Sequence, residues 1–402
     1  MRKASAGPGL LTVLLGAVGV GPLLLYGLSA TSEEIISDLG INEAQFGLLA
    51  TTCFACAALG NATLGRLADR HSDLGLMTVI FLMATFALGL AGVPGGYLVL
   101  LIAVGVSGFA QSFPNGVTNR ILLERVPAQK RIGWVGIKQS GVQVSQLVAS
   151  LTFPLLALLI GWRGTAALAM LIPLTLLVLT WRTLRSVPLL QQTRTTPKDS
   201  GSSPVEGVKQ LRPRHSAAVW ALAAFGCLNG IGVQATNVYL PLFAVRELDF
   251  SLVLGGATAA VAGVVGVTAR IGWARVMARG TSGPVLLFAL ALTSLGGVCA
   301  FLGAQATDWA PLLWTAVVLH GSSALGVSVV LMSVLLRSIP SASMASSSGV
   351  VTAGMFTGFA IGPLGMGIIV SSPGGFTMGW ITVGIIYLLC LLLAAVLIRR
   401  RR

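Results

Sequence analysis

Long apolar runs separated by short polar breaks fill nearly the whole chain. A helix needs about 20 apolar residues to cross the hydrocarbon core of a bilayer. Only 9% of the 402 residues are charged and 55% are hydrophobic, so a water-soluble domain would lack polar side chains to cover its surface. We therefore predict an all-α polytopic membrane protein with twelve transmembrane helices. The expected spans are 9–30, 43–67, 73–95, 97–119, 133–160, 163–185, 216–243, 251–274, 281–303, 309–335, 343–370 and 376–398.

One long polar segment, residues 186–215, divides these spans into six and six. Its many Pro, Ser, Thr, Lys and Arg residues are typical of a flexible linker. The expected domains are an N-terminal six-helix bundle (1–185), a cytoplasmic linker (186–215) and a C-terminal six-helix bundle (216–402). Elements of the first half recur 213 positions later: Leu122-Leu123, Pro127, Gly136 and Gly141 reappear as Leu335-Leu336, Pro340, Gly349 and Gly354. Repeated halves indicate two pseudo-symmetric bundles that rock around a site at their interface.

The net charge of +14 is distributed unevenly over the loops. An excess of Lys and Arg is typical of cytoplasmic loops, so both termini and the linker are predicted to be cytoplasmic. We expect a multi-pass protein of the bacterial cytoplasmic membrane, in contact with lipid and not with nucleic acid. Basic residues gather in alternate loops, at Arg66 and Arg70; Arg125, Lys130 and Arg131; Arg182 to Arg214; Arg275 and Arg279; and Arg399 to Arg402. The intervening loops hold Glu33, Glu34, Asp38, Glu43, Glu247, Asp249 and Asp308, with Arg163 and Arg246 opposing them.

A charged motif, Gly65-Arg66-Leu67-Ala68-Asp69-Arg70, lies between spans two and three. It matches the start of a loop signature of the major facilitator superfamily, which the chain resembles over its whole length. The following glycine and basic residues of that signature are missing. The resemblance implies a cytoplasmic gate made by Gly65, Asp69 and Arg70, with Arg120 as the partner of Asp69; a solvated loop charge is the alternative. The matching position in the second half is Ala278, so the first half is expected to hold the stronger lock.

Two further segments resemble a subgroup of that superfamily, the bacterial cyanate, oxalate/formate and monocarboxylate carriers. They are Gly136-Ile137-Lys138-Gln139-Ser140-Gly141 and Arg270-Ile271-Gly272-Trp273. In the carboxylate carriers an arginine of span eight contacts the substrate carboxylate, and Arg270 occupies the matching position. The glycine-proline motif of antiporters is not intact in span five, and a related run, Gly358 to Pro363, lies in span eleven. This departure argues against drug–proton antiport.

Charged side chains inside membrane spans are costly and usually functional. None of the twelve acidic residues lies in the middle of a span, so a cationic substrate would find no counter-charge. Arg270 and Lys138 each lie about one turn inside a cytoplasmic span end. Either can attract an anion, Arg through a bidentate fork and Lys as a point charge. The alternative for both is snorkelling to the interface.

Uncharged polar residues complete the candidate site. Histidine side chains ordinarily titrate near physiological pH, so His320, in span ten, is a candidate for proton coupling, with a structural histidine as the alternative. Polar residues of spans one, four and seven are candidates for substrate contact. These are Tyr26, Gln111, Asn115, Asn229, Gln234 and Asn237. The alternative is an interfacial aromatic for Tyr26 in span one and interhelical hydrogen bonding for the residues of span seven. The CxxC formed by Cys53 and Cys56 is interpreted as two small apolar residues, not as a metal or redox pair.

The leading interpretation is a secondary transporter that moves a small, carboxylate-bearing organic anion by alternating access, as a monomer and without a cofactor or metal. Protons are the candidate coupling ion. An exporter of a neutral or amphipathic metabolite or antibiotic is the alternative. A membrane enzyme is disfavoured because clustered carboxylates are lacking and the three histidines are scattered. A channel is disfavoured by the repeated halves.

Overall fold

Helices make up nearly all of the chain that the computed structural model describes, which is residues 7–63, 71–186, 216–338 and 341–399. Helices satisfy their own backbone hydrogen bonds, as hydrocarbon requires. Before the linker lie α1 (Pro8–Ala30), α2 (Ser32–Leu39), α3 (Glu43–Thr63), α5 (Asp73–Gly92), α6 (Tyr97–Ala110), α7 (Pro114–Arg125), α8 (Ala128–Gln139), α9 (Gly141–Ala169) and α10 (Leu171–Ser186). After it lie α11 (Ala217–Glu247), α12 (Leu252–Ala278), α13 (Gly283–Thr307), α14 (Ala310–Ala324), α15 (Val327–Ser338), α16 (Ser341–Val370) and α17 (Gly375–Arg399). The predicted all-α polytopic membrane class is confirmed.

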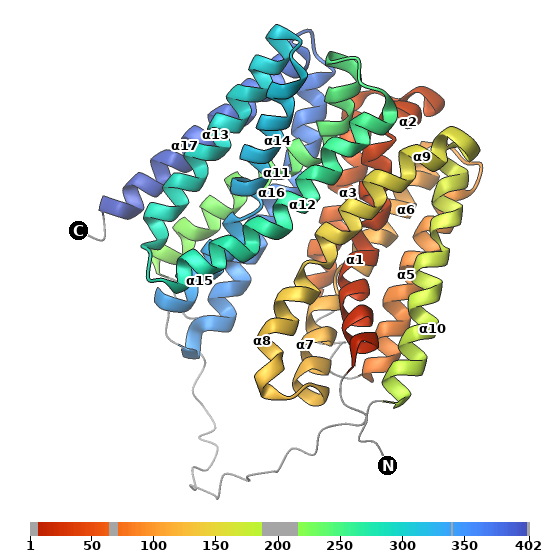
Figure 1. Ribbon diagram of the computed structural model, residues 1–402, viewed down its shortest axis with the longest axis vertical. Coiled ribbons are helices and arrows are strands. Elements are labelled where there is room, and N and C mark those ends of the chain that lie inside the picture. The colour runs from red at the N-terminus through yellow and green to blue at the C-terminus, as the bar shows by residue number, and fades with distance from the viewer. Residues whose placement is uncertain (1–6, 64–70, 187–215, 339–340, 400–402) are drawn as a thin grey trace, which may run out of the picture.

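Eleven segments of the described chain are long and apolar enough to cross a membrane, and one of them, residues 129–186, is 58 residues long. This segment contains two crossings because α9 is broken at Gly161, where φ is 70° and ψ is 164°. Only glycine adopts that conformation without strain. The chain reverses there and returns through α10 (Figure 1). The predicted spans 133–160 and 163–185 are therefore both present, which makes twelve crossings.

Spans five and six, predicted over 133–160 and 163–185, are broken at Ser140, between α8 and α9, and at Met170, between α9 and α10. Spans four and ten are interrupted as well, although the sequence pattern predicted continuous helices over 97–119 and 309–335. The first break separates α6 from α7 at residues 111–113, and the second separates α14 from α15 at residues 325–326. Pro114 starts α7 and lacks the N–H that a continuous helix needs. The two breaks lie 213 to 214 positions apart, which matches the repeat in the sequence. The same local geometry therefore recurs in both halves of the chain.

The two halves of the described chain meet along five pairs of helices. The most extensive are α3 with α16 and α9 with α12, followed by α1 with α11, α1 with α12 and α2 with α11. The backbones approach closely where glycines face the partner helix. A Cβ on Gly47 would lie 2.3 Å from the Pro363 carbonyl oxygen, and one on Gly256 would lie 2.4 Å from the Ser150 carbonyl oxygen. Small residues allow this in membranes, where packing and not water drives helix association.

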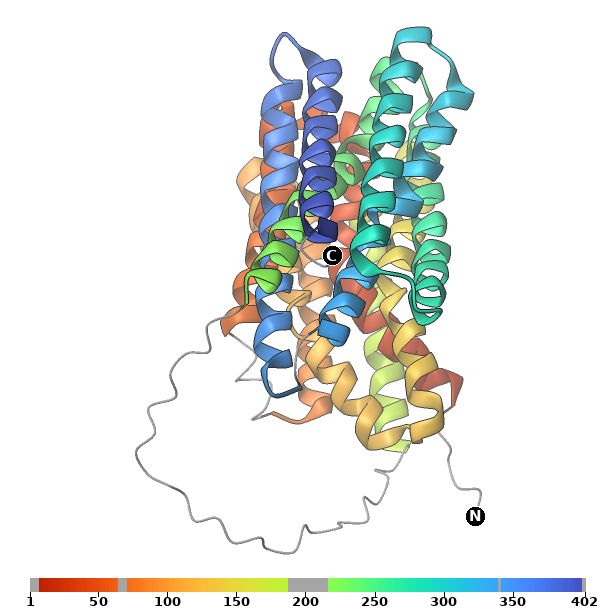
Figure 2. The same ribbon diagram turned by 90° about the vertical axis from the view of Figure 1, so that its left-hand side faces the viewer.

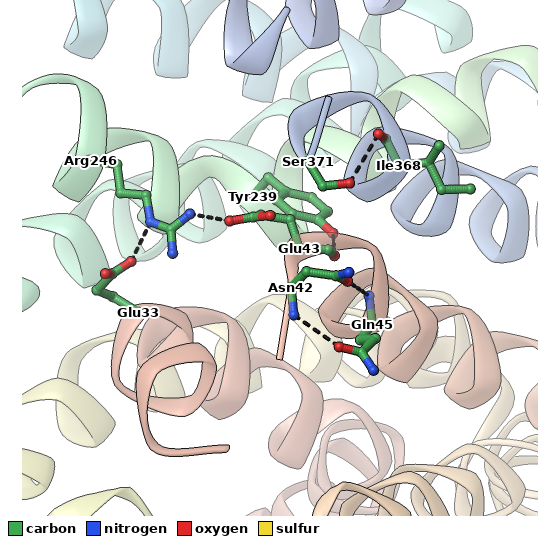
Figure 3. A network of polar contacts seen from close by, with 8 residues as sticks. All are labelled: Glu33, Asn42, Glu43, Gln45, Tyr239, Arg246, Ile368 and Ser371. Atoms are coloured by element: carbon green, nitrogen blue, oxygen red, sulfur yellow. Dashed lines mark hydrogen bonds and ion pairs between the residues drawn. The ribbon is translucent and has the colours of Figure 1, made fainter. Parts of the chain in front are cut away.

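The two ends of the molecule differ in charge and in packing. We name the end with α2 and the start of α3 the acidic end, and the end with the α7–α8 turn and the last turns of α12 and α15 the basic end. At the acidic end the halves are joined by side-chain contacts (Figure 3). At the basic end α7 and α8 lie apart from α15 (Figure 1), and the view turned by 90° shows the spans running along the long axis between the two ends (Figure 2).

Candidate functional site

Arg270 lies at the contact between the halves, where α12 packs against α9. One guanidinium nitrogen, NH1, donates to Gln143 Oε1 at 2.9 Å, across the interface. Nε donates to the Leu325 carbonyl at 3.4 Å. Both acceptors are neutral oxygens, and none of the ion pairs in the described chain includes Arg270. Its partly buried positive charge therefore has no carboxylate partner among the described residues.

The break between α14 and α15 supplies the carbonyls around Arg270. A helix end leaves carbonyl groups without intrahelical donors. The Ala324 carbonyl accepts from Asn229 Nδ2 at 3.2 Å, and the Ser322 carbonyl accepts from Trp273 Nε1 at 2.7 Å. Asn229, a sequence candidate, thus helps to hold the broken helix beside Arg270. A pocket of about 350 Å³ adjoins this turn, lined by Thr268, Ala269, Gly272, Trp273, Val276 and Ser322.

Side chains of the N-terminal half complete the surroundings of Arg270. Tyr26 is buried and lies close enough to interact electrostatically with both Arg270 and Cys53. Gln111, at the break between α6 and α7, donates from Nε2 to Cys53 Sγ at 3.1 Å. Tyr26 and Gln111 were both sequence candidates, whereas Cys53 was interpreted as a small apolar residue. In the structure Cys53 is buried, as an apolar residue would be, and it also accepts the hydrogen bond from Gln111.

The α9 face toward α12 carries polar residues that the sequence analysis did not select. Gln143 bonds Arg270, and Gln146 is fully buried one turn farther from the basic end. Ser150 continues the same face. The spacing i, i+3, i+7 places three residues on one helical stripe, so a search for polar stripes in span five could have found them.

Lys138 and Asn115 lie on the basic-end side of the site. Lys138 is fully buried and donates from Nζ to Thr118 Oγ1 at 2.7 Å. Gln139 Nε2 donates to Asn115 Oδ1 at 3.0 Å, and Asn115 itself is exposed. These contacts join α8 to α7 within the N-terminal half. Lys138 thus contacts a hydroxyl within one half, whereas Arg270 contacts Gln143 across the interface between the halves.

Gln234 and Asn237, on α11, are buried toward the acidic end of the site. The Asn237 and Val238 carbonyls accept from the Ser29 hydroxyl of α1, at 3.2 and 2.7 Å. Gln234 lies one turn earlier on the same face of α11. Its Oε1 is buried and has no hydrogen-bond partner among the described residues.

His320 is buried in the core of the C-terminal half. Its Nε2 lies 2.9 Å from the Tyr387 hydroxyl and 3.3 Å from the Thr236 hydroxyl. The ring also packs edge-on against Phe301 and Tyr387. All of these contacts lie within one half, which favours the structural alternative for this histidine.

A charged cluster at the acidic end joins the halves and was not selected from the sequence. Arg246, at the end of α11, donates from Nε to Glu33 Oε2 at 2.5 Å and from NH1 to Glu43. The Tyr239 hydroxyl donates to the Glu43 backbone carbonyl (Figure 3). We name Arg246, Glu33 and Glu43 the acidic-end latch. The sequence signal that could have predicted the latch is the presence of opposite charges at the same end of the two halves, Glu33 and Glu43 in the first and Arg246 in the second.

Comparison with known proteins identifies the family of this arrangement. The family model of the Major Facilitator Superfamily matches residues 12–352. The chain belongs to the major facilitator superfamily. Members of this superfamily are membrane transporters of small molecules and not enzymes.

Several curated members of the superfamily are similar in sequence. A putative metabolite transport protein of Haemophilus influenzae is 27% identical over 63% of this chain and 64% of that protein. The cis,cis-muconate transport protein of Acinetobacter baylyi is 27% identical over 55% and 54%, and the sialic acid transporter NanX of Escherichia coli is 24% identical over 34% and 34%. The chain therefore spans less than two thirds of the length of each of these relatives.

Solved structures of the superfamily share the fold. A bacterial homologue of the human lysosomal transporter Spinster, in an inward-facing and occupied conformation, has a TM-score of 0.74 at 17% identity, covering 97% of this chain and 96% of that chain. The nucleoside transporter NupG has a TM-score of 0.69 at 15% identity, covering 97% and 98%. These matches confirm the predicted two-bundle, twelve-helix fold.

The loop signature of the superfamily lies largely outside the described residues, which include neither Gly65 nor Asp69 nor Arg70. Arg120, the expected partner of Asp69, is described. Its Nε pairs with Asp73 Oδ1 at 2.6 Å, and NH2 donates to the backbone carbonyl of residue 71 at 2.9 Å. The contact between Asp69 and Arg120 remains a prediction.

Proposed function

We propose that the protein moves a small, carboxylate-bearing organic anion across a membrane by alternating access, and that Arg270 binds the anion. The observation that carries this proposal is the charge of Arg270, which lies between the halves and is bonded to neutral oxygens alone. An unpaired charge in a membrane interior is costly. A substrate carboxylate removes that cost through a bidentate, charge-assisted pair.

Two further observations favour an anion. The described acidic residues lie at helix ends or in connecting segments, as Glu43, Asp73 and Glu247 do, so a cationic substrate would meet no counter-charge in the middle of a span. The names of two relatives mention sialic acid and cis,cis-muconate, which are both carboxylates. The resemblance to cyanate, oxalate/formate and monocarboxylate carriers points in the same direction.

We place the basic end in the cytoplasm, because Lys and Arg are enriched there. The basic end carries Arg125, Lys130, Arg131, Arg275, Arg279 and Arg337. On this assignment both termini are cytoplasmic, and the joined acidic end faces outward. One chain supplies both halves of the interface, so a monomer is sufficient for transport.

The test is anion binding by purified Arg270 variants. Removing one partner of a buried charge pair costs about 2–5 kcal/mol, so Arg270→Ala should weaken carboxylate binding by about 30-fold or more. Arg270→Lys keeps the charge but loses the bidentate fork of the guanidinium. Its affinity for carboxylates should therefore lie between those of the wild type and Arg270→Ala. Arg279→Ala is the matched control, since Arg279 is an exposed cation just after the same helix.

Binding can be followed as a thermal shift, since a ligand that binds the folded state raises its apparent stability. A panel of carboxylates, inorganic anions and neutral antibiotics separates the two transporter interpretations. Unchanged carboxylate affinity in both Arg270 variants would refute the role of Arg270. A response to neutral compounds alone would support the exporter alternative instead.

A further inference from the structure

Near Arg270, α9 carries buried polar groups that have no hydrogen-bond partner among the described residues. Gln146 is 0% exposed, and neither its Nε2 nor its Oε1 has a hydrogen-bond partner within the described chain. The Ser145 and Ser150 hydroxyls are buried and unpaired in the same sense. Native proteins leave few buried polar atoms unsatisfied, and each costs about 1–3 kcal/mol. Four such atoms within six residues therefore need an explanation.

The position of Gln146 is set by the close approach of α9 and α12. A Cβ on Gly266 would lie 3.4 Å from Gln143 Cγ, and one on Gly263 would lie 3.7 Å from Gln146 Cβ. Gly263, Gly266 and Arg270 share one face of α12, at spacings of three and four residues. Gln143 and Gln146 share the facing stripe of α9. Gln146 therefore lies beside the Arg270–Gln143 contact, about 4.5 Å farther along the α9 axis.

We propose that Gln146 forms a second polar subsite, which recognises a hydroxyl group on the transported anion a few bonds from its carboxylate. This inference rests on the proposed function, because Arg270 supplies the carboxylate partner. It narrows the substrate class from organic anions in general to hydroxylated carboxylates.

The chemistry of the unpaired atoms selects a hydroxyl. A primary amide offers both a donor and an acceptor, and both are unused in Gln146. A hydroxyl group also donates and accepts, so it satisfies the two atoms together. A second carboxylate only accepts, which would leave Oε1 unpaired, and a plain alkyl chain would leave both atoms unpaired. The Ser150 hydroxyl, one turn farther along the same stripe of α9, offers a partner for a further substrate hydroxyl.

The experiment compares pairs of anions that differ only in hydroxyl groups, such as 3-hydroxybutyrate with butyrate and lactate with propionate. Affinities are measured on purified full-length protein for the wild type, Gln146→Leu, Arg270→Lys and Gln305→Leu. Gln305 is a matched control, because its amide bonds Glu247 at the acidic end, away from Arg270.

The wild type should bind the hydroxylated member of each pair about 5- to 10-fold more tightly, as one or two net hydrogen bonds predict. Gln146→Leu should abolish this preference without weakening the plain anion. Arg270→Lys should weaken both members alike and keep the preference. Gln305→Leu should change neither quantity.

Two outcomes overturn the inference while leaving the proposed function intact. One is a wild type that binds both members equally. The other is a Gln146→Leu variant that keeps the preference or weakens both members alike, since the amide would then serve folding or conformational change. If no carboxylate binds, or if the affinity for carboxylates is unchanged in Arg270→Ala, the proposed function itself is rejected instead.

Discussion

Breaking the acidic-end latch should open that end of the molecule. The latch pairs Arg246 of the C-terminal half with Glu33 and Glu43 of the N-terminal half. In the substitution Arg246→Met the side chain keeps a similar length and loses its charge, so both ion pairs disappear while the packing of the stem is largely kept.

The size of the effect follows from the exposure of each pair. The Glu33 side chain is 38% exposed, so solvent screening limits that pair to about 0.5 kcal/mol. The Glu43 side chain is 16% exposed, and its hydrogen bond to a charged donor contributes about 1.5 kcal/mol. Together they amount to about 2 kcal/mol, which corresponds to a shift of about 30-fold toward the open acidic end.

Hydrogen–deuterium exchange measures this opening directly, because it reports local opening free energies. In Arg246→Met, amides in residues 32–47 and 239–250 should exchange up to about 30-fold faster. Arg163→Met is the matched control, since Arg163 pairs with Asp38 and both belong to the N-terminal half. It should affect residues near α2 and Gly95, both in the N-terminal half, and leave 239–250 unchanged. The latch would be refuted if the amides of residues 239–250 in Arg246→Met exchanged at rates within about 2-fold of those in the wild type.

Two more predictions concern packing and pH. Gly256→Leu should force α9 away from α12, because a Cβ at this position meets the Ser150 carbonyl oxygen. The free energy of unfolding should fall by about 1–3 kcal/mol. Gly296→Leu is the control, since a Cβ at Gly296 meets no atom within 4 Å, and it should leave thermal stability unchanged. Burial, and secondarily the charge of Asp38, raises the pKa of Glu34, so its contribution to stability is present at acidic pH and is lost as pH rises through the raised pKa. Glu34→Gln should therefore raise the melting temperature at neutral pH and not at pH 4, and an equal gain at both pH values in thermal unfolding would contradict the assignment.

Much of the fold was predictable because the bilayer imposes it residue by residue. Apolar length sets the crossings, and loop charge distinguishes the two ends. The predicted series failed where local backbone chemistry mattered, at the breaks before Pro114 and at Gly326. Hydropathy does not register a broken helix whose side chains remain apolar, so spans four and ten were predicted as continuous.

The candidate site was predicted in part. Charged residues inside the apolar spans were found from the sequence, whereas uncharged polar residues were partly missed. Arg270 was identified because a cation in an apolar run is conspicuous in sequence. Gln143 was missed because an uncharged amide in a span is common as interhelical glue. Its contact with Arg270 joins residues 127 positions apart, and no local pattern predicts such a pairing.

By itself, the sequence determined a twelve-span membrane protein with repeated halves, opposite charges at its two ends and an arginine inside span eight. Only the tertiary structure decided which side chains meet across the halves. Arg246 joins the halves at the acidic end, Gln143 contacts Arg270, and Gln146 is buried with no hydrogen-bond partner among the described residues. The physical reason is that hydrophobicity and charge are properties of each segment, whereas a pairing energy exists only once packing has brought distant segments together and excluded water.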